Sequence, residues 1–162
     1  MTTSSPRLFR HLLVALDDSE EAGHALETAA GLAQHHGCRL TLVSVYRHFS
    51  YTNSRYTQIR VGPIDTENPV DLSLKYQAEE VLARARSRLR QRRLEANYLL
   101  RRGAPTAVII ALAEQLNVDA IVMGSGPRGN IPGRLLGSIA DKISAQAHCS
   151  CIRVRRPRQT IE

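Results

Sequence analysis

The sequence predicts an α/β protein, a single-domain three-layer sandwich in which helices cover both faces of a parallel sheet. Short apolar runs of strand length alternate along the chain with longer segments whose apolar residues recur at helical spacing. The length of 162 residues matches one domain and is sufficient to bury a core. Hydrophobic residues at 43% and charged residues at 23% are typical of a globular protein, and no apolar run is long enough to span a membrane.

Two strands and one helix are predicted in the first part of the chain. The apolar run His11–Leu16 predicts a buried strand, and either Asp18 or Ser19 is expected to cap the helix that follows. An apolar stripe at helical spacing continues this helix as far as Gly37, which supplies a C-terminal stop. The β-branched and apolar run Arg39–Val45 predicts the second strand.

A long connection is expected over residues 46–70, because this stretch holds several turn-forming residues and no sustained period. We predict that it is the least ordered part of the chain. Residues 71–95 are predicted to form a helix with one apolar stripe and many arginines in its C-terminal half. Cations there complement the helix dipole, so we interpret these arginines as a solvated face rather than as a dedicated nucleic-acid patch.

The second half of the chain alternates in the same way. Strands are predicted over 96–101, 119–123 and 149–155, and helices over 106–116 and 138–147. Pro105 is well placed for the first turn of the earlier helix. A glycine-rich segment, residues 124–137, leads into the last helix, where backbone N–H groups and the positive helix end favour a bound phosphate.

The net charge of +7 comes mostly from arginine, because all of the 22 basic residues except Lys75 and Lys142 are arginine. Aromatic residues make up only 4% of the chain and tryptophan is absent, so a platform for base stacking is not expected. No zinc-finger spacing and no basic-zipper heptads occur. We therefore predict no specific nucleic acid and no membrane as a partner, and only salt-sensitive binding to polyanions.

The 3 cysteines, an odd number, argue against a disulfide framework and fit a reducing compartment. Since the N-terminus also lacks the pattern of a secretory signal, we predict a cytoplasmic protein. Cys149 and Cys151 lie on one face of a predicted strand and no second pair exists, so no metal site is predicted. No nucleophile elbow and no Ser–His–Asp or Cys–His arrangement is recognisable, so we predict no catalytic residues.

Ligands of an open parallel sheet bind beyond the carboxyl ends of its strands, where the strand order reverses. Three segments fall at such ends: Asp17–Ser19, the residues around Val45, and the glycine-rich loop that begins at Gly124. This loop matches neither a Walker loop nor the dinucleotide-binding glycine pattern.

Four short motifs in this order resemble the universal stress protein family: Val14–Ser19, Gly103–Pro105, Asp119–Ser125 and Gly137-Ser138. The resemblance covers residues 9–155, so we expect one domain there, with tails at 1–8 and 156–162. It implies a five-stranded parallel sheet of order 3-2-1-4-5, ATP binding in one subgroup, and dimerisation, here as a homodimer paired through the strand at 149–155.

The ATP-binding subgroup carries the pattern Gly-x2-Gly-x9-Gly-Ser/Thr. Gly124 and Gly137-Ser138 keep its first and last positions, but Pro127 stands at the second glycine, and proline has no N–H to donate. The resemblance places Asp17 at the adenine edge and the backbone of Val45 at the base. It places phosphate and ribose contacts at Met123, Gly124, Gly137, Ser138 and Ile139. Two arginines outside the motif, Arg128 and Arg134, are further phosphate candidates.

Two functions therefore stay open. The first is a regulatory module of the stress response that binds an adenine nucleotide, ATP with or without Mg²⁺, at the carboxyl ends of strands one, two and four. The alternative is a family member that has lost ATP binding through Pro127, needs no cofactor and acts as a dimeric interaction protein. We do not predict an enzyme; slow ATP hydrolysis supported by Asp17 and Ser138 stays open, but nothing in the sequence positions an attacking water.

Overall fold

The computed structural model describes residues 8–47, 69–125 and 139–157. The strands are β1 (His11–Leu16), β2 (Arg39–Tyr46), β3 (Asn97–Arg102), β4 (Ala120–Gly124) and β5 (Ser150–Val154). The helices are α1 (Glu20–His36), α2 (Pro69–Gln91), α3 (Pro105–Gln115) and α4 (Ile139–Gln146).

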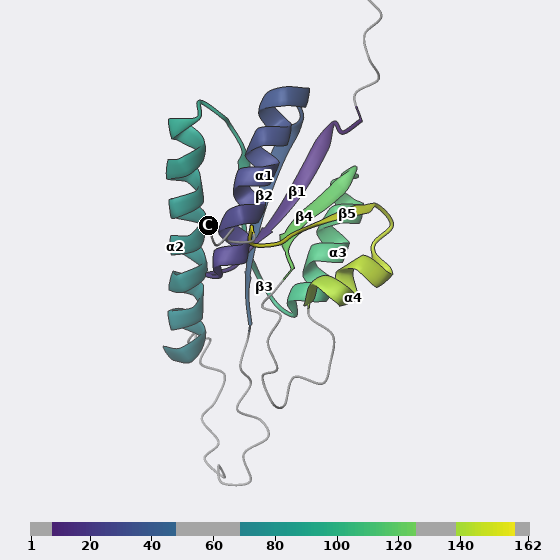
Figure 1. Cartoon of the computed structure of the whole chain (residues 1–162). Coiled ribbons are helices and arrows are strands. Elements are labelled where there is room, and N and C mark those ends of the chain that lie inside the picture. The colour runs from purple at the N-terminus through teal and green to yellow at the C-terminus, as the bar shows by residue number, and fades with distance from the viewer. Residues whose placement is uncertain (1–7, 48–68, 126–138, 158–162) are drawn as a thin grey trace, which may run out of the picture.

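These strands form one five-stranded sheet of order β3-β2-β1-β4-β5, and every neighbouring pair is parallel. Helices α1 and α2 cover one face of the sheet, and α3 and α4 cover the other, which makes three layers (Figure 1). The α/β fold is confirmed, together with the strand order that the family resemblance implied. Among the described helices, none is both long and apolar enough to cross a membrane.

The core is divided by the sheet into two clusters of buried side chains. Because side chains alternate along a strand, Leu12, Val14 and Leu16 of β1 face α1 and α2, whereas Leu13 faces α3 and α4. Both faces of β1 are therefore buried, as expected for the central strand of a parallel sheet. This explains why its sequence is a continuous apolar run rather than an alternating one.

Helix α1 begins and ends as its sequence predicts. Of the two candidate caps, Ser19 is the N-cap, because its hydroxyl accepts a hydrogen bond from the Ala22 N–H at 3.1 Å. The helix ends where Gly37 adopts a left-handed conformation with φ of 64° and donates its N–H to the Ala33 carbonyl at 2.8 Å. The end of β1 is thus joined to α1 by a short turn in which Ser19 caps the helix.

The bounds of α2 correct the prediction over 71–95. The helix starts two residues earlier and ends at Gln91, because Arg93 has a φ of 56° and the Leu94 N–H donates to the Leu89 carbonyl at 2.9 Å. The predicted connection 46–70 is also shorter than expected, since Tyr46 belongs to β2 and residues 69–70 belong to α2. The predicted low order of this connection falls on residues 48–68, which lie outside the described part of the chain.

The remaining corrections are shifts of a residue at the ends of elements. The structure has β3, α3, β4 and β5 at 97–102, 105–115, 120–124 and 150–154, against the predicted 96–101, 106–116, 119–123 and 149–155. Helix α4 ends at Gln146, and its predicted first residue, Ser138, lies outside the described residues. Asp119 shows why such a boundary shifts by one residue. It was expected to begin the strand, but it lies just before β4, and its carboxylate accepts hydrogen bonds from the backbone N–H groups of Arg10 and His11, each at 2.7 Å.

A buried histidine lies at the amino-terminal end of the sheet. The side chain of His11 is 5% exposed, and its Nε2 is 2.8 Å from the Thr41 hydroxyl. Its Nδ1 has no hydrogen-bond partner among the described residues. Burial, reinforced by the positive charge of Arg39, lowers the pKa of His11 below 6.5, against the opposing effects of the Leu116 carbonyl and Asp119.

This lowered pKa predicts a loss of stability in mild acid. Below pH 6.5 the unfolded chain binds a proton at His11 that the folded chain does not bind until its lower pKa is reached. The free energy of unfolding should therefore fall as the pH drops from 6.5 through the folded pKa. In the His11→Gln variant we expect a smaller fall, measured by urea unfolding above and below pH 6.5. His35→Gln, which removes an exposed histidine, is the control, and equal pH slopes in wild type and His11→Gln contradict the prediction.

Candidate functional site

The carboxyl ends of three neighbouring strands meet at one edge of the sheet. In the register, Leu16 of β1 lies opposite Ser44 of β2, and Ala15 lies opposite Met123 of β4. The next residues along each strand are Asp17, Val45 and Gly124, so these predicted site residues lie side by side. Because β2 and β4 flank β1, this edge is the point where the strand order reverses.

Asp17 has a structural role that uses only one of its carboxylate oxygens. Its Oδ1 accepts the backbone N–H of Ser19 at 2.9 Å and also the Ser19 hydroxyl. Within the described part of the chain, its Oδ2 has no hydrogen-bond donor, and the residue is exposed. The turn into α1 therefore holds the carboxylate in place and leaves one strong acceptor directed to solvent.

Position 124 has no room for a side chain, because β4 and α1 approach each other closely there. A Cβ atom at this position would lie 2.7 Å from the Cβ of Glu21 and 2.8 Å from the Glu21 carbonyl carbon, which is closer than real Cβ contacts come. The following Ser125 donates its N–H to the Val154 carbonyl of β5 at 2.9 Å. The start of the glycine-rich segment is therefore attached both to the first turn of α1 and to the last strand.

The other predicted site residues differ in how far their side chains are exposed. Met123 is only 4% exposed and its side chain packs in the core facing α3 and α4, so only its backbone is available at the edge. Val45 is partly buried against the same core, whereas Ile139, the first residue of α4, is 40% exposed. Arg128, Gly137, Ser138 and the departure at Pro127 lie outside the described residues.

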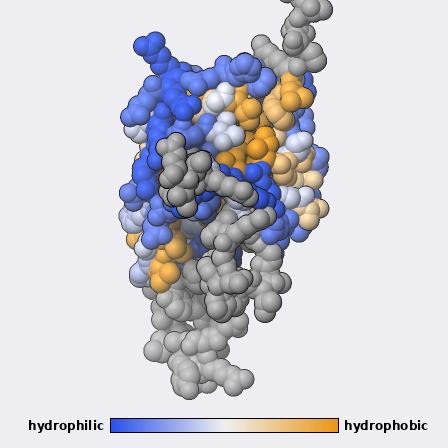
Figure 2. Space-filling view, viewed as in Figure 1, coloured by the Kyte–Doolittle hydropathy of each residue, from blue (hydrophilic) through white to orange (hydrophobic). Residues whose placement is uncertain are grey.

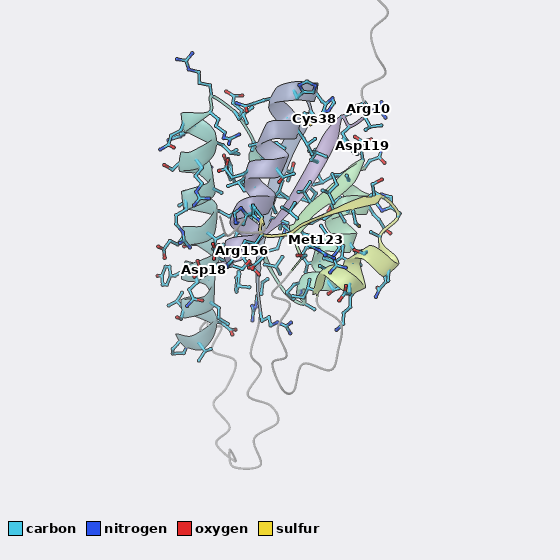
Figure 3. The ribbon with its side chains drawn as sticks, in the orientation of Figure 1. Arg10, Asp18, Cys38, Asp119, Met123 and Arg156 are labelled. Carbon is cyan, nitrogen blue, oxygen red and sulfur yellow. The ribbon has the colours of Figure 1, made fainter. Side chains whose placement is uncertain are left out.

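Charged residues that sequence reasoning missed surround this edge. Arg156 pairs with Glu20 and lies 3.8 Å from the Glu21 carboxylate, so the chain after β5 is attached to the first turn of α1. Arg84 of α2 pairs with Asp18 at 2.5 Å. Figure 3 shows Asp18, Met123 and Arg156 toward one end of the sheet and Arg10, Asp119 and Cys38 toward the other. No local sequence signal links Arg156 to Glu20, because they are far apart along the chain.

A groove of about 450 Å³ opens beside this edge, between α1 and α2. Asp17, Asp18 and Ser19 line one end of it, and Arg84 and Arg88 line its α2 side. The Arg84–Asp18 ion pair joins α2 to the turn that precedes α1 across this groove. The groove therefore combines carboxylates and guanidinium groups next to the carboxyl end of β1.

Cys149 lies directly before β5 and Cys151 lies within it, and both thiols are free. Cys149 and Cys151 both pack against the core that faces α3 and α4, as their alternation predicts. Burial raises the pKa of both thiols, which keeps them protonated. Among the described residues, no three or more His, Cys, Asp or Glu side chains are grouped as metal ligands.

A parallel sheet with helices on both faces, whose order reverses beside Asp17 and Gly124, defines the class of doubly wound α/β proteins. Comparison with known proteins gives the particular family. The sequence model of the universal stress protein family matches residues 8–155, and the chain belongs to this family.

Relatives and solved structures agree with this assignment. A universal stress protein encoded beside a sulfhydrylase gene of Thermus aquaticus is 32% identical over 148 residues, which cover 91% of this chain and 100% of that protein. A universal stress protein solved in complex with cAMP has a TM-score of 0.67 at 20% identity, covering 91% of this chain and 97% of the other. The Archaeoglobus fulgidus universal stress protein in complex with dAMP has a TM-score of 0.60 at 21% identity, covering 91% and 98%.

Proposed function

We propose that this chain is a regulatory module of the stress response that binds an adenine nucleotide, ATP among them, at the carboxyl ends of β1, β2 and β4. The observation that carries the proposal is the meeting of Asp17 and Gly124 at the edge where the strand order reverses. Two structures with the same fold are complexes with adenine nucleotides, cAMP and dAMP, which supports this ligand class.

Each proposed contact follows from the chemistry of the ligand. The Asp17 Oδ2, a carboxylate acceptor, suits the exocyclic amino group of adenine, and the backbone of Val45, near the carboxyl end of β2, suits the base edge. Met123 and Gly124 offer backbone groups to the ribose and phosphates. Ile139, the exposed first residue of α4, is the proposed apolar contact of the ribose. Gly137, Ser138 and Arg128 are the proposed phosphate contacts, with Mg²⁺ as a companion of ATP.

Replacing the amino group of the base by a carbonyl tests the role of Asp17. AMP donates a hydrogen bond from this position, whereas IMP presents an acceptor to the carboxylate. We expect AMP to bind more tightly than IMP by roughly tenfold or more in calorimetric titration. Asp17→Ala should remove most of this preference. Asp18→Ala is the matched control, since Asp18 pairs with Arg84 and should leave the preference intact.

Two results of this titration would contradict the proposal. Equal affinities of the wild-type protein for AMP and IMP would remove Asp17 from the base site. No detectable heat with AMP, ATP or Mg-ATP at millimolar concentration would remove nucleotide binding itself. The second result would leave the alternative, a family member that acts through protein contacts and needs no cofactor.

The position of β5 at an edge of the sheet favours the alternative function, a dimeric interaction protein. Ile152 and Val154 are partly buried against the core facing α1, and Figure 2 shows apolar surface on the β5 side of α1. We propose that this strand, residues 149–155, pairs across a two-fold axis to form a homodimer. The side chain of Arg153 pairs with Asp141 of α4 at 2.5 Å, which reduces the repulsion between arginines that such pairing brings together.

Three further expectations remain part of this proposal. The chain acts by binding rather than by catalysis, and slow ATP hydrolysis is the only reaction left open. Residues 9–155 form the functional domain, and residues 1–8 and 156–162 are tails, of which Arg156 is attached to α1. The cytoplasm is the proposed location, as the cysteine usage suggests.

A further inference from the structure

A shallow hollow rich in arginine lies where α2 meets β3, away from the proposed nucleotide site. We call it the α2–β3 hollow; its volume is about 640 Å³. Arg86, Arg90 and Arg93 line one side of it, Tyr98 of β3 forms part of its wall, and the chain between helix and strand completes it. The full lining is Arg86, Arg90, Arg93, Leu94, Glu95, Ala96 and Tyr98.

The guanidinium groups of this hollow lack the carboxylate partners that other arginines of the same region have. Arg84 pairs with Asp18 in the turn before α1, and Arg92 pairs with Glu27 of α1. In the described part of the chain, Arg86, Arg90 and Arg93 form no ion pair with an acidic side chain. Glu95 is the one acidic residue of the lining, so the hollow has a net positive charge.

The surroundings of Tyr98 indicate which kind of anion the arginines of the hollow can bind. The Arg86 guanidinium lies over the Tyr98 ring, 4.4 Å from its centroid. Burial raises the pKa of the Tyr98 phenol, while Arg86 and Arg90 act in the opposite direction, because both positive charges lie close to it. Since Arg86 occupies a face of the ring, that face is not available to stack a nucleic-acid base. This favours a carboxylate-bearing partner over a nucleic acid.

The strand beside the hollow has one side unpaired within the described part of the chain. β3 is at an edge of the sheet and pairs only with β2, so its outer N–H and C=O groups form an open ladder. Tyr98 and Leu100 face α2, whereas Leu99 faces the opposite layer. By the same alternation, Arg101 extends to that opposite side, where its guanidinium donates a hydrogen bond to the Leu100 carbonyl at 2.9 Å.

We propose that the β3 edge and the α2–β3 hollow together bind an extended acidic segment of a partner protein, which adds to the sheet as a further strand. The main chain of the segment pairs with β3, and main-chain pairing supplies affinity without regard to sequence. Its acidic side chains that point toward α2 meet Arg86, Arg90 and Arg93, and those on the other face meet Arg101. Bidentate arginine–carboxylate contacts then select an acidic segment over other extended chains.

A synthetic peptide of alternating glutamate and valine is the probe, compared with the same peptide carrying glutamine for glutamate. We expect only the acidic peptide to bind, with added salt weakening it, and hydrogen exchange at residues 97–102 to slow in its presence. Arg90→Glu, and separately Arg93→Glu, should weaken binding by about tenfold or more. Lys142→Glu, the same charge reversal on exposed α4, should change it by less than about twofold.

Three outcomes would overturn the proposal. The first is no binding of the acidic peptide, or equal binding of the glutamine peptide. The second is binding that Lys142→Glu weakens as much as Arg90→Glu, which would indicate net charge alone. The third is a single-stranded RNA oligonucleotide that displaces the peptide, depends on the same arginines and leaves exchange at residues 97–102 unchanged. That result would assign the hollow to nucleic acid. The variants of this test change Arg90 and Arg93, which lie away from the proposed nucleotide site, and leave Arg101, which lies opposite Val45 in the register, unchanged.

Discussion

Replacing Pro127 by glycine is expected to tighten the binding of an adenine nucleotide by roughly ten- to hundredfold. In the glycine pattern of the ATP-binding subgroup, this position supplies a backbone N–H near the phosphates, and proline has none. A hydrogen bond to a charged group contributes roughly 1.5–3 kcal/mol, which corresponds to this range of affinity. Calorimetric titration of wild type and Pro127→Gly with Mg-ATP measures the difference directly.

The same loop provides the control for this experiment. Pro132→Gly makes the same chemical change a few residues further on, at a position that the glycine pattern does not require. It increases the conformational freedom of the loop without restoring the missing donor, so we expect it to leave the affinity unchanged or slightly weaker. Equal tightening by both substitutions would attribute the effect to flexibility. No binding by either protein would leave the interaction protein as the better interpretation of the chain.

Alanine at position 124 is expected to lower the free energy of unfolding by about 1–3 kcal/mol. The added methyl group would meet the Cβ and the carbonyl carbon of Glu21 at 2.7 and 2.8 Å, and the second of these is backbone that cannot rotate away. The first turn of α1 and the end of β4 must then separate. Equilibrium urea unfolding of wild type and Gly124→Ala gives the change in free energy.

Gly31 is the matched control for this substitution. It is exposed in the middle of α1, and apart from the neighbouring helix backbone no atom of the described residues lies within 4 Å of a Cβ atom built there. Alanine has the higher helix propensity by about 1 kcal/mol, so Gly31→Ala should stabilise the protein. If Gly124→Ala were as well tolerated as Gly31→Ala, the close approach of β4 and α1 would not be a constraint on this family member.

The order of the helices and strands was predictable because, along most of the chain, the spacing of apolar residues and the positions of turn-forming residues indicate the same element boundaries. His11–Leu16 was predicted to the residue, since its apolar run is bounded by Asp17 and Asp18. The end of α2 was not predictable in the same way. Arg90, Gln91 and Arg92 are good helix formers, and the helix stops at a left-handed arginine, Arg93, rather than at a glycine. The end of the helix is seen only in the structure, where the Leu94 N–H donates a hydrogen bond to the Leu89 carbonyl.

The candidate site was predictable where it depends on topology and not where it depends on packing. A parallel sheet of this strand order necessarily brings the carboxyl ends of β1, β2 and β4 to one edge, so Asp17, Val45 and Gly124, which lie at or just beyond these ends, were expected together. The contact between Gly124 and Glu21 depends on how closely α1 packs on β4, which alternation in the sequence does not encode. The ion pair of Arg156 with Glu20 depends on the path of the chain after β5.

Because β3 and β5 lie at opposite edges of the sheet, a dimer joined through β5 would have two binding edges for a partner protein. The strand order puts β1 in the centre and these two strands at the outer edges, so a contact at one edge leaves the other uncovered. Two copies joined through β5 carry one β3 edge at each far end of the pair. Such a pair is bivalent, and a partner with two acidic segments that reach both ends would bind by avidity, roughly 10²–10⁴ times more tightly than through either end alone. Pairing through β5 therefore sets the number and the spacing of the β3 edges offered to a partner.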